Sequence, residues 1–577
     1  MNLTSLIHSI LLSSSLADIF SVGNAGAALD TTSGTVRGKA STLRPGVSEY
    51  LGIPYAKAPK GDLRFAAPQP ADTSSTVLEA TSYGPACPQA HSSQQHESPG
   101  GPVANKLMRS ASPANPTFDE DCLTINVWTK PHQGEKKKAV LFWIHGGGFQ
   151  TGSGTLPLTD GSVLADENDV IVVSFNYRLN IFGFPGAPGQ PWNVGLLDQR
   201  LALEWTRDNI AQFGGDPSRI TVFGQSAGGA SADFLTYSYP EDPIAHAVIA
   251  QSGDANAQPY QAKTAELQKK WYNASSALGC GDTDAGQETV SCMRSKTPDE
   301  LLALVEKDDG EGLENKFIPA QDGVVLPRDI LKAGSAGKFA RIPFMTGTTD
   351  KEGDLFMFLA MADTNATSKR ANVIPMDLVR PISDILTLTT FTCPAAEAAK
   401  YRSDHNVPVW RYRYYGGNYS NTYFAPFGSA YHASELPLLF GTAATVTGVE
   451  DSEYEAKAAA YMRNAWATFA KHPATGLDSE FHWPRFSPQT KSEVQLSLHE
   501  QTQASFISNA ETDALCPIAG LAEGLIEVVS KLFSHIATDG ETSQLGGRFH
   551  DTLKSPFTDA SSVENAIDSL RGTASHL

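Results

Sequence analysis

The sequence lacks a long uninterrupted apolar segment. Its main apolar run lies at the N-terminus, between Leu6 and Leu16, and serines interrupt it. A helix that spans a bilayer needs about 18 or more consecutive apolar residues. The sequence therefore predicts no transmembrane span and no stable membrane insertion.

Basic residues are scarce relative to acidic ones. The 577 residues include 44 Lys and Arg against 63 Asp and Glu, which gives a formal net charge of −19. Nucleic acids and anionic membranes bind surfaces rich in Lys and Arg, so we expect no nucleic-acid partner. Hydrophobic residues make up 41% of the chain, which is enough for a large folded core.

Internal repeats and metal-binding motifs are also missing. No segment repeats with a period of about 20–50 residues, and neither H-E-x-x-H nor a pair of C-x-x-C motifs occurs. We therefore expect one large domain rather than a repeat array, with no metal and no organic cofactor. Nothing in the sequence indicates an oligomeric state.

The N-terminus is typical of a signal peptide, because small residues follow the short apolar run. We predict that residues 1–27 are this peptide and that cleavage follows Ala17 or Ala27. The first five residues carry no Lys or Arg, so a disordered leader or an N-terminal helix is the alternative. With export, we expect the protein to be secreted or to stay in the lumen of the secretory pathway.

Cysteines and glycosylation sequons agree with export. The chain has six cysteines, an even number that suggests disulfides and allows 15 pairings. Six buried thiols are the alternative. Beyond residues 1–27, the N-x-S/T triplets without a central proline begin at Asn273, Asn365 and Asn418, and each is a candidate glycosylation site.

Short apolar runs alternate with helical stretches from about Leu29 onward, which predicts a mostly parallel sheet with helices on both faces. We assign residues 28–538 to this domain and residues 539–577 to a polar C-terminal tail. Leu521–Phe533 is expected to be a terminal helix, and Pro88–Asp121 a long loop. The predicted strands are Lys138–Ile144, Val170–Phe175, Ile220–Phe223, Ala247–Ala250, Ile342–Met345 and Val407–Tyr415.

Two glycine-rich motifs follow predicted strands. Gly224–Gly228 is a G-x-S-x-G motif, whose glycines let Ser226 stand on a sharp strand-to-helix turn with its hydroxyl clear of the sheet. His145-Gly146-Gly147-Gly148 follows the strand Lys138–Ile144. Its N–H groups, with that of Ala227, could bind an oxyanion. The alternatives are an ordinary strand–helix turn for the first motif and a flexible loop or phosphate cradle for the second.

These motifs and several others resemble those of the type-B carboxylesterases, the family of fungal lipases, carboxylesterases and cholinesterases. The resemblance covers roughly residues 29–520 and implies an α/β-hydrolase fold with a central mixed, mostly parallel sheet flanked by helices. The further matching segments are Leu51–Ala56, Glu120–Val127, Asn176–Leu179, Asn193–Arg200 and Phe213–Pro217.

The resemblance implies a catalytic triad with Ser226 as the nucleophile. Glu352 matches the family's acid in Gly347–Gly353, although Lys351 replaces the usual Asp, and Asp350 and Asp354 are rivals. The base must be a later His, and His432 matches the family's His-x-x-Glu segment. Gly147, Gly148 and Ala227 match the oxyanion hole, and Ser252 and Glu435 match residues that support the triad. The disulfides implied by the resemblance are Cys87–Cys122, Cys280–Cys292 and Cys393–Cys516.

The expected substrate is a small-molecule carboxylic ester. Choline esters are rejected, because Gln225 replaces the Glu usual in cholinesterases and Pro88–Asp121 contains no Trp to face a cation. The same loop has few large apolar residues, and its prolines should break any long helix, so a soluble ester is favoured over a lipid. A triacylglycerol lipase and a biosynthetic transesterase or lactone-processing enzyme are the alternatives. A non-catalytic adhesion protein is disfavoured, because all three triad residues are present.

Overall fold

The computed structural model describes residues 25–90, 100–130, 133–305, 316–359 and 376–518. An 11-stranded sheet runs through these residues in the order β14-β13-β12-β11-β10-β9-β7-β8-β6-β4-β3. The seven neighbouring strands β13, β12, β11, β10, β9, β7 and β8 pair in parallel. At one end β14 pairs antiparallel with β13, and at the other β6, β4 and β3 add to β8 as antiparallel strands. The predicted mixed, mostly parallel sheet of an α/β-hydrolase fold is therefore confirmed. A smaller sheet joins β1 (Leu29–Thr31), β2 (Gly34–Arg37) and β5 (Leu78–Glu79).

The large sheet contains the following strands in chain order. They are β3 (Lys39–Ala40), β4 (Ser48–Pro54), β6 (Thr124–Thr129), β7 (Lys138–Ile144), β8 (Ile171–Phe175), β9 (Gly215–Gln225), β10 (Ala247–Gln251), β11 (Phe344–Thr349), β12 (Val409–Tyr414), β13 (Glu493–Leu496) and β14 (Ser505–Ile507). All six strands expected from the sequence are present, β7 with the predicted ends and the other five with ends shifted by up to five residues.

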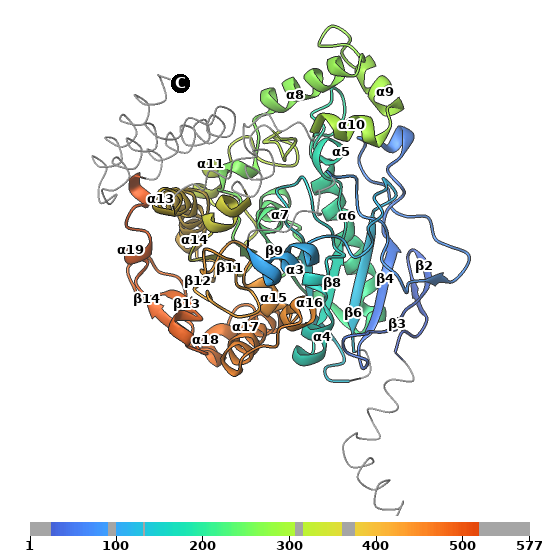
Figure 1. Cartoon of the computed structure of the whole chain (residues 1–577). Helices are drawn as coiled ribbons and strands as arrows, with labels where there is room; N and C mark the ends of the chain where they lie inside the picture. The colour runs from blue at the N-terminus through green and yellow to red at the C-terminus, as the bar shows by residue number, and fades with distance from the viewer. Residues whose placement is uncertain (1–24, 91–99, 131–132, 306–315, 360–375, 519–577) are drawn as a thin grey trace, which may run out of the picture.

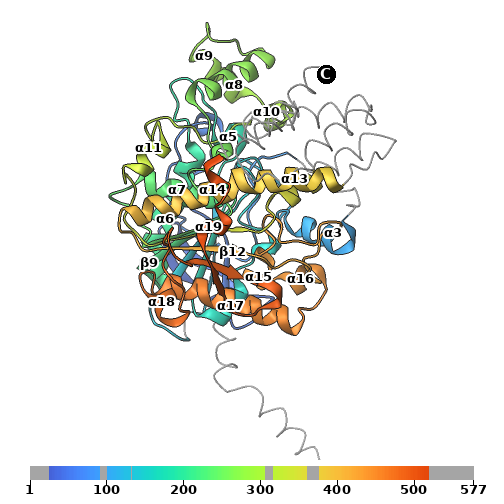
Figure 2. The same ribbon diagram turned by 90° about the vertical axis from the view of Figure 1, so that its left-hand side faces the viewer.

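Helices cover both faces of the sheet (Figures 1 and 2). The helices on the first face include α6 (Val194–Asn209), α7 (Ala227–Ser238) and α14 (Cys393–Asp404), and those on the second include α4 (Ser162–Asn168) and α17 (Glu453–Lys471). Side chains of β7 alternate between two buried clusters. Val140, Phe142 and Ile144 belong to one, and Leu141 and Trp143 to the other. This alternation is the two-residue period of a strand with two buried faces.

Further helices lie between the strands and near the C-terminal end of the described chain. They are α3 (Gly101–Ser110), α5 (Asn180–Gly183), α8 (Thr264–Ala277), α9 (Glu288–Ser295), α10 (Pro298–Val305), α11 (Ile330–Ser335), α13 (Met376–Leu386), α15 (Leu436–Leu439), α16 (Ala443–Thr447), α18 (Gly476–Glu480) and α19 (Asn509–Thr512). Figure 1 shows α8 and α9 together at the top of the molecule. No helix among the described residues is long and apolar enough to cross a membrane.

The segment Pro88–Asp121 differs from the expected irregular loop. It contains the ten-residue helix α3, so the expectation of a loop over the whole segment is wrong. Pro102 lies in the first turn of α3, where a proline removes no intrahelical hydrogen bond. Ala104 and Leu107 are buried in the same cluster as Phe358, with Val103 and Met108 packed beside them.

Three disulfides stabilise the fold, in the pairs that the family resemblance implied: Cys87–Cys122, Cys280–Cys292 and Cys393–Cys516. The last joins the start of α14 to the end of the described chain across 123 residues. The predicted helix Leu521–Phe533, the tail 539–577 and the cleavage site after Ala17 lie outside the described residues.

Candidate active site

Parallel strands bring the candidate residues to one edge of the sheet. The carboxyl ends of β7, β9, β10 and β11 lie side by side in register. The glycine loop, which is Gly146-Gly147-Gly148, follows β7 after His145. Ser226 follows β9, Ser252 follows β10, and Glu352 follows β11 after two further residues. Ligand sites in open α/β sheets form at this edge.

Ser226 stands on a strained turn between β9 and α7. Its backbone has φ 60° and ψ −128°, a conformation that costs a non-glycine residue about 1–3 kcal/mol. The N–H of Ser226 donates to the carbonyl of Gln251 at 2.8 Å, which fixes the turn against β10. A Cβ at Gly228 would lie 2.0 Å from the carbonyl oxygen of Ile144, so only glycine lets α7 start this close to β7.

The glycine loop lies against the candidate nucleophile. A Cβ at Gly146 would be 3.0 Å from the Cβ of Ser226, and Gly147 and Gly148 have φ of 108° and 61°. Among the described residues, the N–H groups of Gly147, Gly148 and Ala227 donate to no protein acceptor. Ala227 is also the first residue of α7, whose N-terminal dipole favours negative charge. These donors are free to bind an oxyanion.

His145 packs beneath the glycine loop, against Tyr177. Its ring stacks on Tyr177 with centroids 4.4 Å apart, and its Nδ1 bonds the carbonyl of Gly146 at 2.9 Å. Burial lowers the pKa of His145 to about 4, so the ring is neutral at ordinary pH. His145 is therefore an uncharged, packed side chain that supports the glycine loop, and it does not carry protons.

Glu352 and His432 form a buried pair. His432 Nδ1 donates to Glu352 Oε2 at 2.6 Å, and the N–H of Thr349 donates to Glu352 Oε1 at 2.7 Å. Glu352 is fully buried. The Lys351 N–H donates to the Ala430 carbonyl at 2.9 Å, which holds the acid and histidine loops side by side. The carboxylate fixes the imidazole tautomer that carries its proton on Nδ1 and leaves Nε2 as the acceptor nitrogen.

The two rival acids are engaged elsewhere. Asp350 forms an ion pair with Arg413 at 3.2 Å. Asp354 accepts hydrogen bonds from Arg380 at 2.8 Å and Ser383 at 2.6 Å. Neither contacts His432, so the geometry favours Glu352 as its partner.

The side chains of Ser226 and His432 are not hydrogen-bonded to each other, and each bonds a different residue. Among the described residues, Ser226 Oγ bonds the hydroxyl of Tyr260 at 3.1 Å, and Gln225 Nε2 donates to His432 Nε2 at 3.1 Å. The imidazole also packs against Phe356 and Phe391, with ring centroids 5.1 and 4.9 Å away. The sequence motifs did not indicate Tyr260, Phe356 or Phe391, because none of these three residues belongs to a motif.

Glu435 and Ser252 lie behind the triad. Glu435 Oε1 accepts from Gln251 Nε2 at 3.0 Å, and Gln251 Oε1 accepts from Trp466 Nε1 at 3.0 Å. Glu435 Oε2 and Ser252 Oγ are buried without a partner among the described residues. Burial first, and then the charge of Glu352, raise the pKa of Glu435 to about 8. Glu435 is therefore largely protonated at neutral pH and adds little charge beside Glu352.

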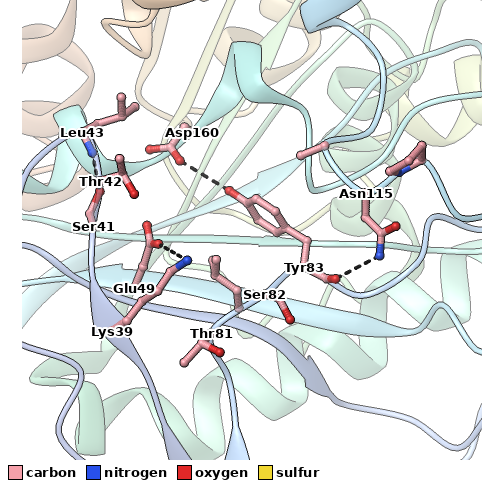
Figure 3. A pocket seen from close by; sticks show the side chains of 13 residues that line it. Lys39, Ser41, Thr42, Leu43, Glu49, Thr81, Ser82, Tyr83, Asn115 and Asp160 are labelled. Carbon is pink, nitrogen blue, oxygen red and sulfur yellow. Dashed lines mark hydrogen bonds and ion pairs between the residues drawn. The ribbon is translucent and has the colours of Figure 1, made fainter.

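A separate polar cavity of about 550 Å³ lies at the base of the Pro88–Asp121 segment. Figure 3 shows the Tyr83 hydroxyl directed at Asp160 and the Lys39 ammonium directed at Glu49. Neither a histidine nor a triad residue lines this cavity. It therefore lacks the nucleophile and base that the sheet edge provides. In the part of the chain that the structure describes, no three His, Cys, Asp or Glu residues cluster in a way that could hold a metal ion.

Comparison with known proteins agrees with the geometry. The chain is 34% identical over 495 residues to a para-nitrobenzyl esterase of Bacillus subtilis, covering 81% of this chain and 94% of the relative. It is 32% identical over 515 residues to an acetylcholinesterase of Bungarus fasciatus (81% and 82% covered) and 31% identical over 516 residues to secreted lipase 5 of Gibberella zeae (84% and 93% covered). The family model described as "Carboxylesterase family" matches residues 25–380 and 373–515. The chain thus belongs to the carboxylesterase family and is a serine hydrolase of carboxylic ester bonds.

Proposed function

We propose that this protein is an exported serine carboxylesterase that hydrolyses a soluble ester through an acyl-enzyme. The observation that supports this most is the buried Glu352–His432 pair, joined at 2.6 Å, beside a serine held on a strained turn. The family includes esterases, cholinesterases and lipases. Membership of this family therefore indicates the reaction but not the substrate.

Acylation starts when Ser226 Oγ attacks the ester carbonyl carbon and its proton moves to His432 Nε2. The carbonyl π electrons move to the oxygen, and the N–H groups of Gly147, Gly148 and Ala227 bind this oxyanion; one such donor is typically worth about 2.7–4 kcal/mol in the transition state. The intermediate collapses as the carbon–oxygen bond to the alcohol breaks. The departing oxygen takes the proton from His432, while Glu352 stabilises the imidazolium in between.

Deacylation repeats these steps with water as the nucleophile. His432 takes a proton from water, the hydroxide attacks the acyl carbonyl, and the bond to Ser226 Oγ breaks. Oγ recovers the proton from His432, and the carboxylic acid leaves. In both halves His432 Nε2 must exchange its hydrogen bond with Gln225 for one with the reacting oxygen.

Labelling with a fluorophosphonate tests this proposal. The wild-type protein should gain one covalent adduct on the peptide that contains Ser226, and Ser226→Ala should gain none. The turnover of nitrophenyl esters by Ser226→Ala should fall by about 10⁶-fold, with an unchanged melting temperature. Full activity in this variant, or an adduct on another serine, would place the nucleophile elsewhere.

A triacylglycerol lipase is the second candidate, and helix α3 favours it. The buried and half-buried residues Val103, Ala104, Leu107 and Met108 give α3 an apolar side, as a lid needs. A transesterase or lactone-processing enzyme would use the same triad chemistry with an alcohol in place of water. Product analysis with and without an added alcohol separates hydrolysis from acyl transfer.

The proposal includes export, cleavage of residues 1–27, a catalytic domain over residues 28–538 and a tail over residues 539–577. Three disulfides support an oxidising compartment. Asn273 and Asn418 are exposed, as glycosylation requires, and Asn365 lies outside the described residues. Expression in a secreting eukaryotic host should release a protein with a shortened N-terminus, and removal of N-glycans should lower its mass. A full-length, unglycosylated product retained in the cell would contradict this part.

A further inference from the structure

Tyr260 contacts the nucleophile from a segment that the triad mechanism does not use. It ends the short turn Gln258–Tyr260, between β10 and α8, and its side chain is 2% exposed. Its hydroxyl lies 3.1 Å from Ser226 Oγ, and this is its one hydrogen bond among the described residues. Its ring packs edge-on against Phe149, which follows the glycine loop.

During the reaction the Tyr260 hydroxyl would be the hydrogen-bond donor to Ser226 Oγ. Burial raises its pKa well above the usual value for tyrosine, so it stays neutral. Because Ser226 gives its own proton to His432, the bond between the two hydroxyls can persist only with Tyr260 as the donor. Once Ser226 Oγ becomes an ester oxygen it is a weak acceptor. The buried Tyr260 hydroxyl then lacks a good partner, which is unfavourable.

The acyl group of the substrate is placed to supply that partner. The tetrahedral carbon carries Oγ, the oxyanion, the leaving oxygen and the acyl chain. The oxyanion faces Gly147, Gly148 and Ala227, and the leaving oxygen must face His432, which protonates it. The acyl chain takes the remaining direction, and Tyr260 reaches Oγ from a segment that contributes to neither of those two sites.

We propose that Tyr260 is a specificity-determining residue, which selects acyl groups with an oxygen acceptor on the carbon next to the scissile carbonyl. Such groups are 2-alkoxy, 2-hydroxy and 2-oxo acyl chains. Their oxygen lies within two bonds of the carbon attached to Oγ, so it can accept the hydrogen bond that the acylated serine gives up. This inference rests on the proposed esterase function and narrows its substrate class.

The test compares two nitrophenyl esters of equal chain length, methoxyacetate and butyrate, in which one oxygen replaces one methylene. Methoxyacetate is intrinsically more reactive, so the quantity of interest is its kcat/KM divided by that of butyrate. This ratio should be about tenfold higher in the wild type than in Tyr260→Phe, the factor expected for one net hydrogen bond. A general loss of activity in Tyr260→Phe affects both esters and cancels in this ratio.

Tyr55→Phe is the matched control, because the Tyr55 hydroxyl is equally buried but donates to the carbonyl of Asn176, which contacts no triad residue. Its ratio should equal that of the wild type. Active sites are counted by fluorophosphonate labelling, so misfolded protein does not distort the comparison. Equal ratios in the wild type and Tyr260→Phe would overturn the inference but leave the esterase function intact. A wild type that hydrolyses neither ester would instead refute the proposed function.

A second measurement needs only the wild-type enzyme. Moving the oxygen further along the chain, as in 4-methoxybutyrate compared with hexanoate, takes it out of reach of Tyr260. The preference for the oxygen-containing ester should then fall to the difference in intrinsic hydrolysis rates. An equal enzymatic preference at both oxygen positions would contradict a hydrogen bond beside the carbonyl.

Discussion

At the scale of residues, the site depends on which carboxylate touches the imidazole. Glu352 is fully buried and contacts His432 directly, whereas Asp350 is partly exposed and pairs with Arg413. Glu352→Gln should therefore lower kcat by up to about 10⁴-fold, as expected when a triad acid no longer holds the correct tautomer. Asp350→Asn should change kcat by less than about threefold, because it removes a partly exposed ion pair. Steady-state kinetics on one soluble ester check both variants, and the reverse order would move the acid to Asp350.

A second prediction at this scale concerns Gln225. Its amide donates to His432 Nε2 at 3.1 Å, so Gln225→Glu places a negative charge at the same distance. The charge stabilises the protonated imidazole, which cannot accept the serine proton. The acid limb of the kcat/KM profile should therefore move to higher pH, by about one unit or more. Gln225→Asn keeps a neutral amide and should leave the limb in place. An unmoved limb in Gln225→Glu would show that the two side chains do not meet in the working enzyme.

At the scale of elements, helix α3 decides between esterase and lipase kinetics. Its four apolar side chains already pack within the protein, and each buried large side chain stabilises this closed position by roughly 1.5–3 kcal/mol. Ten residues offer too small an apolar face to offset the loss of these contacts on opening. The rate on a short-chain ester should saturate normally and should not jump above the solubility limit of the substrate.

Leu107→Ser is the control for this prediction, because it loosens α3 without touching the triad. Its kcat/KM on soluble esters should match the wild type if α3 does not gate the site. A jump in rate with a triglyceride emulsion, or a faster Leu107→Ser enzyme, would make the lipase interpretation correct.

Elements also show what the sequence could and could not predict. Apolar continuity predicted β7 correctly to the residue, because both of its faces are buried and every position from Lys138 to Ile144 is enclosed. It missed β4 and β6 as strands, since polar residues such as Glu49 and Asn126 interrupt their apolar pattern. Helix α3 was missed because Pro102 was counted as a breaker, although its place in the first turn makes it harmless.

The motifs pointed to Glu352 and His432, which the structure brings into contact, but they did not indicate the contacts of Ser226 with Tyr260 and of His432 with Gln225. Tyr260 lies 34 residues from Ser226, and the two meet because β10 runs beside β9 and the chain then turns back over the site. Such proximity depends on the path of a loop, which leaves no periodic signal in the sequence. The role of the glycines was predictable, because the steric reason for them is local.

At the scale of the whole molecule, a buried acid links stability to pH. Burial, and then the charge of Asp233, raise the pKa of Asp254 to about 8 from an ordinary value of 3.8. A raised folded-state pKa means that the folded protein binds the proton more tightly. The stabilisation is therefore fully present below the unfolded pKa and is lost as pH rises toward about 8.

Asp254→Asn removes this titration while keeping an acceptor for the N–H of Asn256, which now lies 2.8 Å from the Asp254 carboxylate. The melting temperature of the variant relative to the wild type should rise by a few degrees between about pH 5 and about pH 8.5. Scanning calorimetry across this range measures the difference. A difference that stays constant with pH would show that Asp254 is ionised throughout.

The ends of the large sheet carry one more consequence. Its two outermost strands, β3 with two residues and β14 with three, are the shortest in it. The free rim of a sheet is where a second chain could add itself by backbone pairing, and a short rim strand offers few groups for that. The sheet thus ends in strands too brief to template growth, which protects a wide, strongly apolar structure from self-assembly into aggregates.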